Sequence, residues 1–205
     1  MYRVNDLFYT LQGEGTHTGR PAVFLRFAGC NLWTGREADR ATAACRFCDT
    51  DFADVKTTYT DAARLADAVA ALWPDSGRRM VVITGGEPTL QLDKHLLLLL
   101  RARGFFIALE TNGTRRVPDG VDWVCVSPKA GTYIRQRHAD ELKLVYPQPH
   151  LGPDVATELV TARSQRLQPM DGPNYEANLA AAVDYCLTHP AWSLSLQTHK
   201  VIGIA

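Results

Sequence analysis

The chain has 205 residues, of which 46% are hydrophobic, and its 22 basic side chains balance 22 acidic ones. This length suits one domain with a sizeable core, expected to span residues 1–205, and the zero net charge argues against nucleic-acid binding while mildly favouring self-association. The leucine run from Leu96 to Leu100 is far shorter than the roughly 20 residues of a membrane span. The first ten residues lack the apolar core of a signal peptide, so the sequence predicts a cytoplasmic protein. In that reducing compartment, clustered cysteines bind metal more often than they form disulfides.

Apolar patterns along the chain predict strands that alternate with helices. The expected strands cover residues 22–29, 79–86, 105–113, 122–129, 142–147, 164–170 and 192–200, and the expected helices cover 60–73, 92–104 and 174–187. Thr60 is the expected N-cap of the first helix, and residues 31–51, which show no period, are expected to form a long loop. This alternation favours parallel pairing, because parallel strands need crossover connections. We therefore predict an α/β fold, an open, partial TIM-like barrel of about six mostly parallel strands with about three helices, since a closed barrel needs ~250 residues.

Polar and glycine residues follow several of the expected strands directly. In such folds the reactive loops lie beyond the carboxyl ends of the strands, so these residues should gather in one place. They are Cys30, Gly85, Gly86, Asn112, Ser127 and Lys129. This convergence predicts an active site at that edge of the sheet.

Three of the five cysteines, Cys30, Cys45 and Cys48, are separated by fourteen residues and then by two. A structural zinc site usually takes four ligands, and His17 is a distant candidate for the fourth. A [4Fe–4S] cluster is the other solution, because three thiolates leave one iron open to an exogenous ligand. The spacing alone leaves zinc and iron–sulfur equally open. The two remaining cysteines, Cys125 and Cys186, are expected to be small core residues.

The cysteine loop resembles the cluster loop of radical S-adenosylmethionine enzymes. In that superfamily three cysteines bind a [4Fe–4S] cluster, here Cys30, Cys45 and Cys48, and an aromatic residue precedes the last cysteine, as Phe47 does. The segment TGGEPTL, residues 84–90, resembles the GGEP motif that binds the amino end of S-adenosylmethionine. Two motifs at matching strand ends identify the chain as a member of this superfamily. The resemblance implies that one electron from the cluster cleaves S-adenosylmethionine to a 5′-deoxyadenosyl radical.

The fourteen-residue spacing departs from the three residues usual in the superfamily and is similar to that of a group of 7-carboxy-7-deazaguanine synthases. Further segments fit this group: LQGEG (11–15), FLRFAGCNLW (24–33), CDT (48–50), ETNGT (110–114), SPK (127–129), LQPMDG (167–172) and LQTHK (196–200). The resemblance covers nearly the whole chain. It implies a radical ring contraction of 6-carboxy-5,6,7,8-tetrahydropterin to 7-carboxy-7-deazaguanine with loss of ammonia, in 7-deazapurine (queuosine precursor) biosynthesis. It also implies a homodimer, a magnesium requirement and an electron-donor protein such as flavodoxin.

Residues matching the family motifs are expected to bind S-adenosylmethionine. Two glycines would let the backbone approach the ligand, and a carboxylate suits an ammonium group. The expected set is Phe47, Gly85, Gly86, Glu87, Ser127, Pro128, Lys129, Gln168, Pro169, Met170 and Asp171. No protein side chain is expected to act as the catalytic group, since the cluster and the cofactor would carry the chemistry.

A second set is expected to bind the pterin. A glutamate accepts two parallel hydrogen bonds from an amidine-like edge. An arginine in an apolar strand would bind the substrate carboxylate through bidentate hydrogen bonds, although it could instead face solvent or an internal acid. The expected set is Leu11, Gln12, Gly13, Glu14, Arg26, Thr84 and the terminal carboxylate of Ala205, which could alternatively pack or fray.

Thr50 matches the threonine that binds magnesium in this family, with Asp49 and Asp51 as outer partners, because Mg²⁺ seeks hard oxygen ligands and keeps several waters. The alternative is a turn stabilised by Asp and Thr side chains. His199 and Lys200 could line the site, although a histidine at a strand end is more often structural. For the inserted residues 31–44, one hypothesis is that they cap the cluster or receive the electron donor.

Two other functions remain open from the sequence. A different radical S-adenosylmethionine enzyme, such as a glycyl-radical activase, would modify a protein backbone and would not need Glu14 and Arg26 around a small pterin. A zinc-stabilised binding module would contain zinc without sulfide, and the lack of a basic stripe argues against one that binds nucleic acid.

Overall fold

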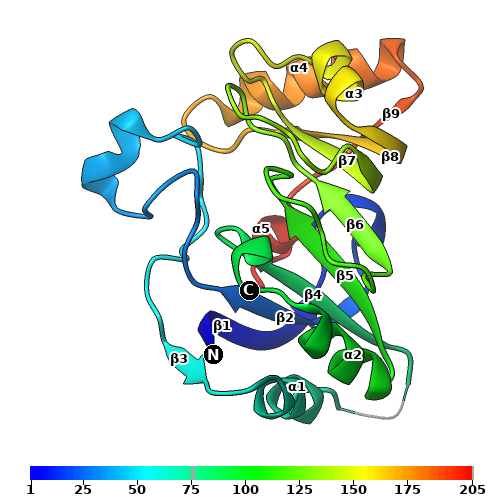
Figure 1. Ribbon diagram of the computed structural model, residues 1–205. Helices are drawn as coiled ribbons and strands as arrows, with labels where there is room; N and C mark the ends of the chain where they lie inside the picture. Colours follow the sequence, from blue (N-terminus) through cyan, green and yellow to red (C-terminus); the bar gives the residue numbers. More distant parts are fainter. Residues whose placement is uncertain (75–76, 205) are drawn as a thin grey trace.

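The computed structural model describes residues 1–74 and 77–204, and within these ranges all strands belong to one sheet (Figure 1). The strands are β1 (Tyr2–Leu11), β2 (Pro21–Phe27), β3 (Thr57–Tyr59), β4 (Arg79–Gly85), β5 (Phe105–Thr111), β6 (Trp123–Val126), β7 (His138–Tyr146), β8 (Thr161–Pro169) and β9 (Trp192–Leu194). The helices are α1 (Ala62–Ala71), α2 (Lys94–Ala102), α3 (Pro153–Leu159), α4 (Tyr175–Thr188) and α5 (Thr198–Ile202), with short 3₁₀ turns η1 (Gly15–His17), η2 (Glu37–Thr42) and η3 (Pro88–Leu90).

The sheet runs in the order β3-β1-β2-β4-β5-β6-β7-β8-β9. From β2 to β9 each strand pairs in parallel with its neighbour, whereas β1 pairs antiparallel with both β2 and β3. The sheet therefore stays open, with β3 and β9 at its two edges. This confirms the expected α/β class and the mostly parallel, partial barrel.

Four helices cover one face of this sheet. Figure 1 shows α1 and α2 against one end of it and α3 and α4 against the other. The buried cluster at the first end contains Leu65 of α1 and Leu96 of α2, together with Leu25 of β2. The cluster at the second end contains Ala182 of α4 packed with Leu142 of β7. Each helix lays its apolar side on the sheet, which is the usual way for both elements to bury their hydrophobic faces.

The opposite face of the same strands is polar near their carboxyl ends. Successive side chains on a strand point to opposite faces, so the neighbours of the core residues turn inward. One polar residue from each of five strands lines the same cavity: Arg26 on β2, Thr84 on β4, Glu110 on β5, Lys143 on β7 and Gln168 on β8. Arg26 and Thr84 are direct partners in the β2–β4 register. The pleat of the sheet thus builds a polar interior beside an apolar core.

Several elements differ from the sequence-based expectations. The sheet of the described residues has nine strands rather than about six: the seven expected ranges all contain a strand, and β1 and β3 were not expected. Helix α1 is capped by Asp61, whose carboxylate accepts the backbone N–H of Arg64 at 2.9 Å, and not by Thr60. The expected strand 192–200 ends at Leu194, and residues 198–202 form α5 instead. The unexpected α3 begins with Pro153, a residue suited to the first helical turn.

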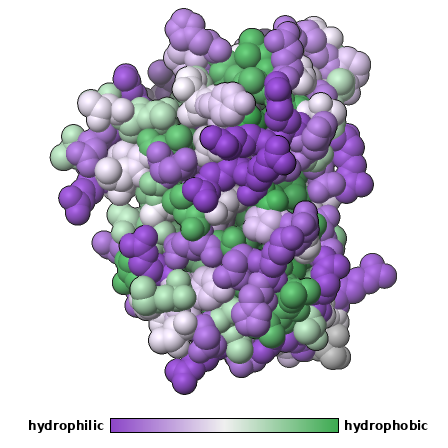
Figure 2. All heavy atoms as spheres, viewed as in Figure 1, coloured by the Kyte–Doolittle hydropathy of each residue, from purple (hydrophilic) through white to green (hydrophobic). Residues whose placement is uncertain are grey.

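The segment between β2 and β3 projects from the sheet (Figure 1). It contains η2, so the expected loop has a short helical turn within it. Figure 2 shows that the viewed face of the molecule is largely hydrophilic, with apolar side chains in small separate groups. Among the described residues, none of the helices has the length and apolar character required to span a bilayer.

Candidate active site

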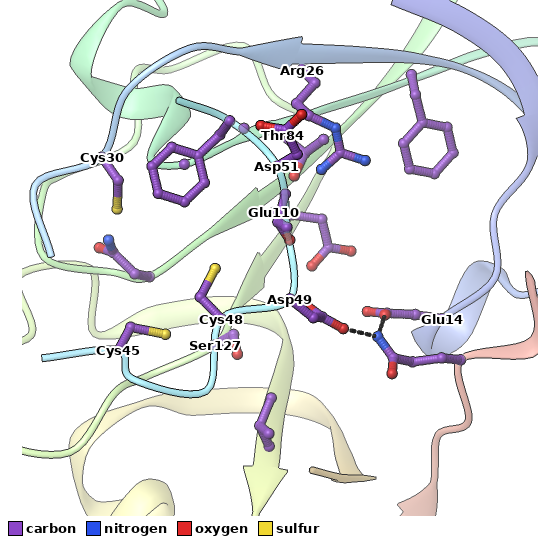
Figure 3. Close-up of a pocket in the computed structure, with 18 of the residues that line it drawn as sticks. Glu14, Arg26, Cys30, Cys45, Cys48, Asp49, Asp51, Thr84, Glu110 and Ser127 are labelled. Atoms are coloured by element: carbon purple, nitrogen blue, oxygen red, sulfur yellow. Dashed lines mark hydrogen bonds between the residues drawn. The ribbon is translucent and has the colours of Figure 1, made fainter. Parts of the chain in front are cut away.

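A cavity of about 610 Å³ lies at the carboxyl ends of the parallel strands. Its walls come from the loop after β2, the inward-facing strand residues, the β1–η1 loop and α5 (Figure 3). Most of the expected site residues line it: Leu11, Gln12, Gly13, Glu14, Arg26, Cys30, Cys45, Phe47, Cys48, Thr50, Thr84, Gly85, Gly86, Ser127, Lys129, Gln168, Pro169 and Asp171. One cavity therefore collects residues from both ends of the chain.

The three thiols of the cysteine loop face a common space. Figure 3 shows the sulfur atoms of Cys30, Cys45 and Cys48 pointing into the same part of the cavity, and none of them forms a disulfide. A hydrogen bond from the Cys45 thiol lowers the pKa of Cys48 and raises that of Cys45, while burial raises the pKa of Cys30, so without metal the thiolate form is favoured at Cys48 alone. Soft thiolate ligands suit an iron–sulfur cluster, and three of them beside an open cavity leave room for an outside ligand. The residues present fit a site-differentiated [4Fe–4S] cluster.

The other candidates for metal binding lie elsewhere. The ring of His17 packs edge-on against Phe106 and Trp123, 5.5 and 4.7 Å between centroids, so it is part of an aromatic group away from the cysteines. Cys125 is buried on β6 beside Glu141, and Cys186 packs against the core around α4. A structural zinc site needs four ligands, and none of these three residues lies where it could be the fourth beside Cys30, Cys45 and Cys48.

The glycine pair after β4 is required by its surroundings. Gly85 has φ +151°, and a side chain there would collide with the backbone of Phe27. At Gly86 a Cβ would collide with Gly29 and with the Cβ of Cys30. The glycines therefore let the β4 loop pass directly beside the first cysteine, and both line the cavity.

Glu87 does not behave as expected from the motif. Its side chain is fully buried and lies outside the cavity lining. One carboxylate oxygen accepts from the backbone N–H and hydroxyl of Thr89 and from the hydroxyl of Thr111, and the other accepts the Asn112 backbone N–H at 2.8 Å. With these hydrogen bonds the carboxylate ties the glycine loop to the end of β5 instead of facing a ligand ammonium.

The remaining residues expected to bind S-adenosylmethionine divide into two groups. Lys129 donates to the hydroxyl and the carbonyl of Ser127 at 2.8 and 2.7 Å, so the Ser-Pro-Lys turn presents an ammonium to the cavity. Gln168, Pro169 and Asp171 also line it, as expected. Besides Glu87, two residues of the expected set are not part of the lining, namely Pro128 and Met170. Each is a neighbour in sequence of lining residues, whose turns they shape.

Glu14 lies in a buried group of charges in the cavity wall. Its carboxylate is 2.6 Å from the Lys143 ammonium, which also lies 2.8 Å from Glu110. Burial opposes ionisation of Glu14, but Lys143 outweighs it and lowers the pKa of Glu14. Burial raises the pKa of Glu110, and the neighbouring carboxylates of Glu141 and Glu14 add to the effect although Lys143 opposes it. The wall thus holds an ionised acceptor, Glu14, beside a second carboxyl that protonates more readily.

Arg26 faces the cavity without a partner. Among the described residues its guanidinium forms neither a hydrogen bond nor an ion pair, and burial lowers its pKa although four carboxylates at longer range oppose the effect. Figure 3 shows Arg26 beside Thr84 and Asp51. A half-buried, unpaired guanidinium has five donors available for an anionic ligand.

The loop of residues 12–14 is held from both sides. Gln12 accepts the Glu14 backbone N–H at 3.1 Å through its side-chain oxygen, and a Cβ on Gly13 would collide with the ring of His199. Gln197 donates to Glu14 at 3.0 Å and to Asp49 at 2.9 Å. The expected contact from Ala205 lies outside the described residues.

Thr50, the expected magnesium ligand, lines the cavity directly after the cysteine loop. Its neighbour Asp49 is bound by Lys200, whose ammonium is 2.6 Å both from Asp49 and from Asp171. Asp49 and Asp51 also line the cavity. The described residues contain no group of three His, Cys, Asp or Glu side chains that could hold a single metal ion, so Mg²⁺ here would depend on ligand oxygens.

Sequence reasoning missed several cavity residues. Glu110 and Lys143 are each a lone charge in an apolar strand, the same signal that identified Arg26, so the pattern could have found them. Asn112 was noted only as a strand-end residue. Gln197 was not considered. His199 and Lys200 were named as residues that could line the site, although the histidine, placed at a strand end rather than on α5, was considered more often structural. All of these residues line the cavity.

Comparisons with known proteins agree with this geometry. Residues 39–181 match the family model "Radical SAM superfamily". The 7-carboxy-7-deazaguanine synthase of Bradyrhizobium diazoefficiens is 56% identical over 208 residues, covering 99% of each chain, and that of Bordetella pertussis is equally similar. The crystal structure of QueE from Escherichia coli has a TM-score of 0.70 and 28% identity, and covers 97% of this chain and 94% of its own.

The match in sequence runs through the cysteine loop, the glycine pair and the Glu14 loop alike, since it spans nearly the whole of both chains. The partial barrel with a cavity at its strand ends matches in structure. This chain belongs to the 7-carboxy-7-deazaguanine synthase family of the radical S-adenosylmethionine superfamily.

Proposed function

We propose that this protein is a carbon–nitrogen lyase that converts 6-carboxy-5,6,7,8-tetrahydropterin to 7-carboxy-7-deazaguanine with loss of ammonia. The observation that carries this proposal is the single cavity that opens on three free thiols at one side and on Glu14 and Arg26 at the other. A cluster-bound cofactor and a small bicyclic substrate would meet there. The names of its relatives point to the same product.

In this proposal Cys30, Cys45 and Cys48 hold the [4Fe–4S] cluster through their thiolates. When bound, the cluster and S-adenosylmethionine supply the radical chemistry that starts the ring contraction. The protein's own contribution is to orient the cofactor and the substrate and to exclude water from the cavity. Gly85 and Gly86 allow close backbone approach for the methionine end of the cofactor, while Glu87 fixes the loop that carries them.

Further along the cavity, Ser127 and Lys129 would bind polar groups of the cofactor. Phe47 would contact the adenine, and residues 168–171 would contact the adenosine. The turn geometry supports this, because Lys129 is fixed by two hydrogen bonds to Ser127 and retains a third donor.

The pterin would lie between Glu14 and Arg26. Glu14 is ionised and has acceptor capacity for the N–H donors of the pterin edge, and Gln12 and the backbone of Leu11 and Gly13 would read adjacent atoms. Arg26 would bind the substrate carboxylate, for which its guanidinium has all donors free. Thr84, paired with Arg26 in register, would contact the same end, and we propose Ala205 as a further contact.

We propose Thr50 as a magnesium ligand that acts only with substrate bound, because one hydroxyl is a weak ligand alone. Asp49 and Asp51 are its nearest acidic neighbours in the cavity wall. We further propose one functional domain of residues 1–205, a homodimer, a cytoplasmic location and an electron-donor protein such as flavodoxin. These rest on the family resemblance and on the zero net charge.

The test is anaerobic turnover of the reconstituted protein with S-adenosylmethionine, reductant and Mg²⁺, with and without the pterin. We expect 5′-deoxyadenosine release that rises with pterin, together with 7-carboxy-7-deazaguanine and ammonia. Release that is indifferent to pterin but is stimulated by a peptide would reject this substrate in favour of an activase. Absence of bound iron and sulfide would reject the cluster itself.

A further inference from the structure

The fourteen residues between Cys30 and Cys45 form a folded unit rather than a loose excursion. Its small core consists of Trp33 and Ala43, which are nearly inaccessible, together with Phe52 from the other side of the cysteines. The rings of Trp33 and Phe52 meet edge to face at 5.6 Å. Cys30 and Cys48 pack against this core. The unit therefore packs against two of the expected cluster ligands.

One side chain joins this unit to the second half of the cysteine motif. Arg40, on η2, donates from one terminal nitrogen to the carbonyl of Arg46 at 2.7 Å and to the carbonyl of Cys48 at 3.1 Å. These two carbonyls stand on either side of Phe47. The guanidinium therefore fixes the backbone of the turn that carries both the last thiol and the aromatic residue expected at the cofactor.

Arg40 is itself held on two other sides. Its guanidinium stacks on Trp33, with 4.2 Å from the central carbon to the ring centroid. Its Nε donates to both carboxylate oxygens of Glu37 at 2.9 and 2.7 Å. A planar fork that stacks, pairs and donates at once is specific to arginine, because a lysine ammonium offers neither the plane nor the spread of donors.

A longer loop needs such a brace for an entropic reason. Closing a loop of fourteen residues costs more conformational entropy than closing one of three. The longer loop therefore restrains the relative positions of Cys30 and Cys45 less. Contacts within the inserted unit must supply the missing constraint. Arg40 is the residue of that unit whose side chain reaches the backbone between Cys45 and Cys48.

We infer that Arg40 is a positioning residue for the iron–sulfur cluster, acting through the main chain of Arg46 and Cys48. This inference rests on the proposed cluster ligands. It gives the inserted residues a role that needs no partner protein, because Arg40 of this unit fixes the main chain that carries a cluster ligand.

The test compares Arg40→Ala with Arg36→Ala, which removes the same charge from an exposed residue of the same unit whose side chain has no partner among the described residues. Each protein is reconstituted anaerobically and then exposed to an iron chelator, and cluster loss is followed by visible absorbance. Losing charge-assisted hydrogen bonds should make Arg40→Ala release its cluster about tenfold faster than the unmodified protein. Arg36→Ala should stay within about twofold, as for ordinary surface changes.

A second readout separates positioning from general stability. The electron paramagnetic resonance spectrum of the reduced cluster with S-adenosylmethionine should broaden in Arg40→Ala, while the thermal midpoint of the cluster-free variant stays near that of the unmodified cluster-free protein. Arg40→Lys keeps the charge but lacks the planar guanidinium, so its rate of cluster loss should fall between those of Arg40→Ala and the unmodified protein. Equal rates of cluster loss and equal spectra for Arg40→Ala and Arg36→Ala would overturn the inference. A rate of cluster loss in Arg40→Lys equal to that of the unmodified protein would overturn it too.

The ligand assignment is checked separately with Cys48→Ser. If that variant holds as much iron and sulfide as the unmodified protein, the proposed ligands are wrong whatever Arg40 does. If it holds little while Arg40→Ala behaves like Arg36→Ala, the ligands stand and only the brace fails.

Discussion

The Lys143 ammonium lies 2.6 Å from the carboxylate of Glu14, although 129 positions separate the two residues in the chain. The same ammonium is 2.8 Å from Glu110, and only 6% of the Lys143 side chain is exposed. One buried cation from β7 therefore balances acids from the β1–η1 loop and from β5. The charge state of the cavity wall around Glu14 and Glu110 depends on this one residue.

Replacing Lys143 with methionine should destabilise the cluster-free protein by roughly 3–5 kcal/mol, because two carboxylates would lose their buried partner. The free energy of unfolding, measured with denaturant, checks this. Lys94→Met is the matched control, since Lys94 pairs with Asp119 on the surface at 2.8 Å and should cost under ~1 kcal/mol.

The loss in Lys143→Met should also depend on pH. Without the cation, the folded-state pKa values of both carboxyls rise above their unfolded values, so the folded protein binds more protons. Its stability relative to the unmodified protein should then fall as pH rises from about 5 to 8. A loss that is the same at pH 5 and pH 8 would contradict the assigned charges.

Arg26→Met should separate binding from stability. It removes a guanidinium whose burial is uncompensated by a hydrogen bond or ion pair, so unfolding free energy should not decrease by more than about 1 kcal/mol. Affinity for the carboxylated pterin should fall by about 10- to 100-fold, as for loss of a charged pair. Calorimetric titration with the pterin and with its analogue lacking the carboxylate checks this, and an equal loss for both ligands would reject the contact.

Lys200→Met tests the contact between α5 and the cavity rim. Burial disfavours the charged form of Lys200, but its hydrogen bonds to Asp171 and Asp49 outweigh this and raise the pKa of the lysine. The hydrogen bond from Lys200 is the main cause that lowers the pKa of Asp171. Burial opposes ionisation of Asp49, but its hydrogen bonds to Gln197 and Lys200 outweigh this and lower its pKa. The carboxylates contribute stability above about pH 4 and lose it as pH falls through their lowered values. The lysine contributes below about pH 10.4 and loses it as pH rises through its raised value.

The stability difference between the unmodified protein and Lys200→Met should therefore be flat from about pH 5 to 10 and vanish at both extremes. All three side chains are about 40% exposed, so solvent screening limits the plateau to about 1 kcal/mol or less. Denaturant titrations across this range check it. A difference that peaks at either extreme would mean that the ion pairs are not its source.

Glu87→Gln tests the internal role of the motif glutamate. The amide presents donors to groups that now donate to a carboxylate, so the protein should lose roughly 1.5–3 kcal/mol of unfolding free energy without any cofactor present. Glu158→Gln, on the exposed end of α3, is the control. Unchanged stability combined with weaker S-adenosylmethionine binding would instead indicate direct contact with the ligand.

The sequence predicted the parts of the site that follow strands directly. Cys30 and the pair Gly85 and Gly86 were found because a strand ending in such residues has few interpretations in an α/β fold. Arg26 was found because a lone charge stands out in an apolar strand. These are local signals, and the parallel topology turns them into a shared location.

Long-range pairing could not be predicted in the same way. Lys143 is a lone charge in its expected strand, as Arg26 is, but nothing in the sequence indicates that it pairs with Glu14, 129 positions away. The motif alone gives no sign that Glu87 turns inward, because its partners Thr111 and Asn112 lie about 25 positions away. Strand β1 has a break in register between Val4 and Asp6, which disturbs the alternation that would otherwise have revealed it.

The hold of α5 on the β1–η1 loop has a consequence for the order of events during synthesis. The Thr198 backbone N–H donates to the Gly13 carbonyl at 2.9 Å, and Gln197 donates to Glu14. The cysteine unit and the first parallel strands are made long before these residues. On the ribosome, a growing chain can thus fold the cysteine unit and the first parallel strands while the wall beside Glu14 is still missing, and the cavity becomes complete only when residues 197–200 arrive.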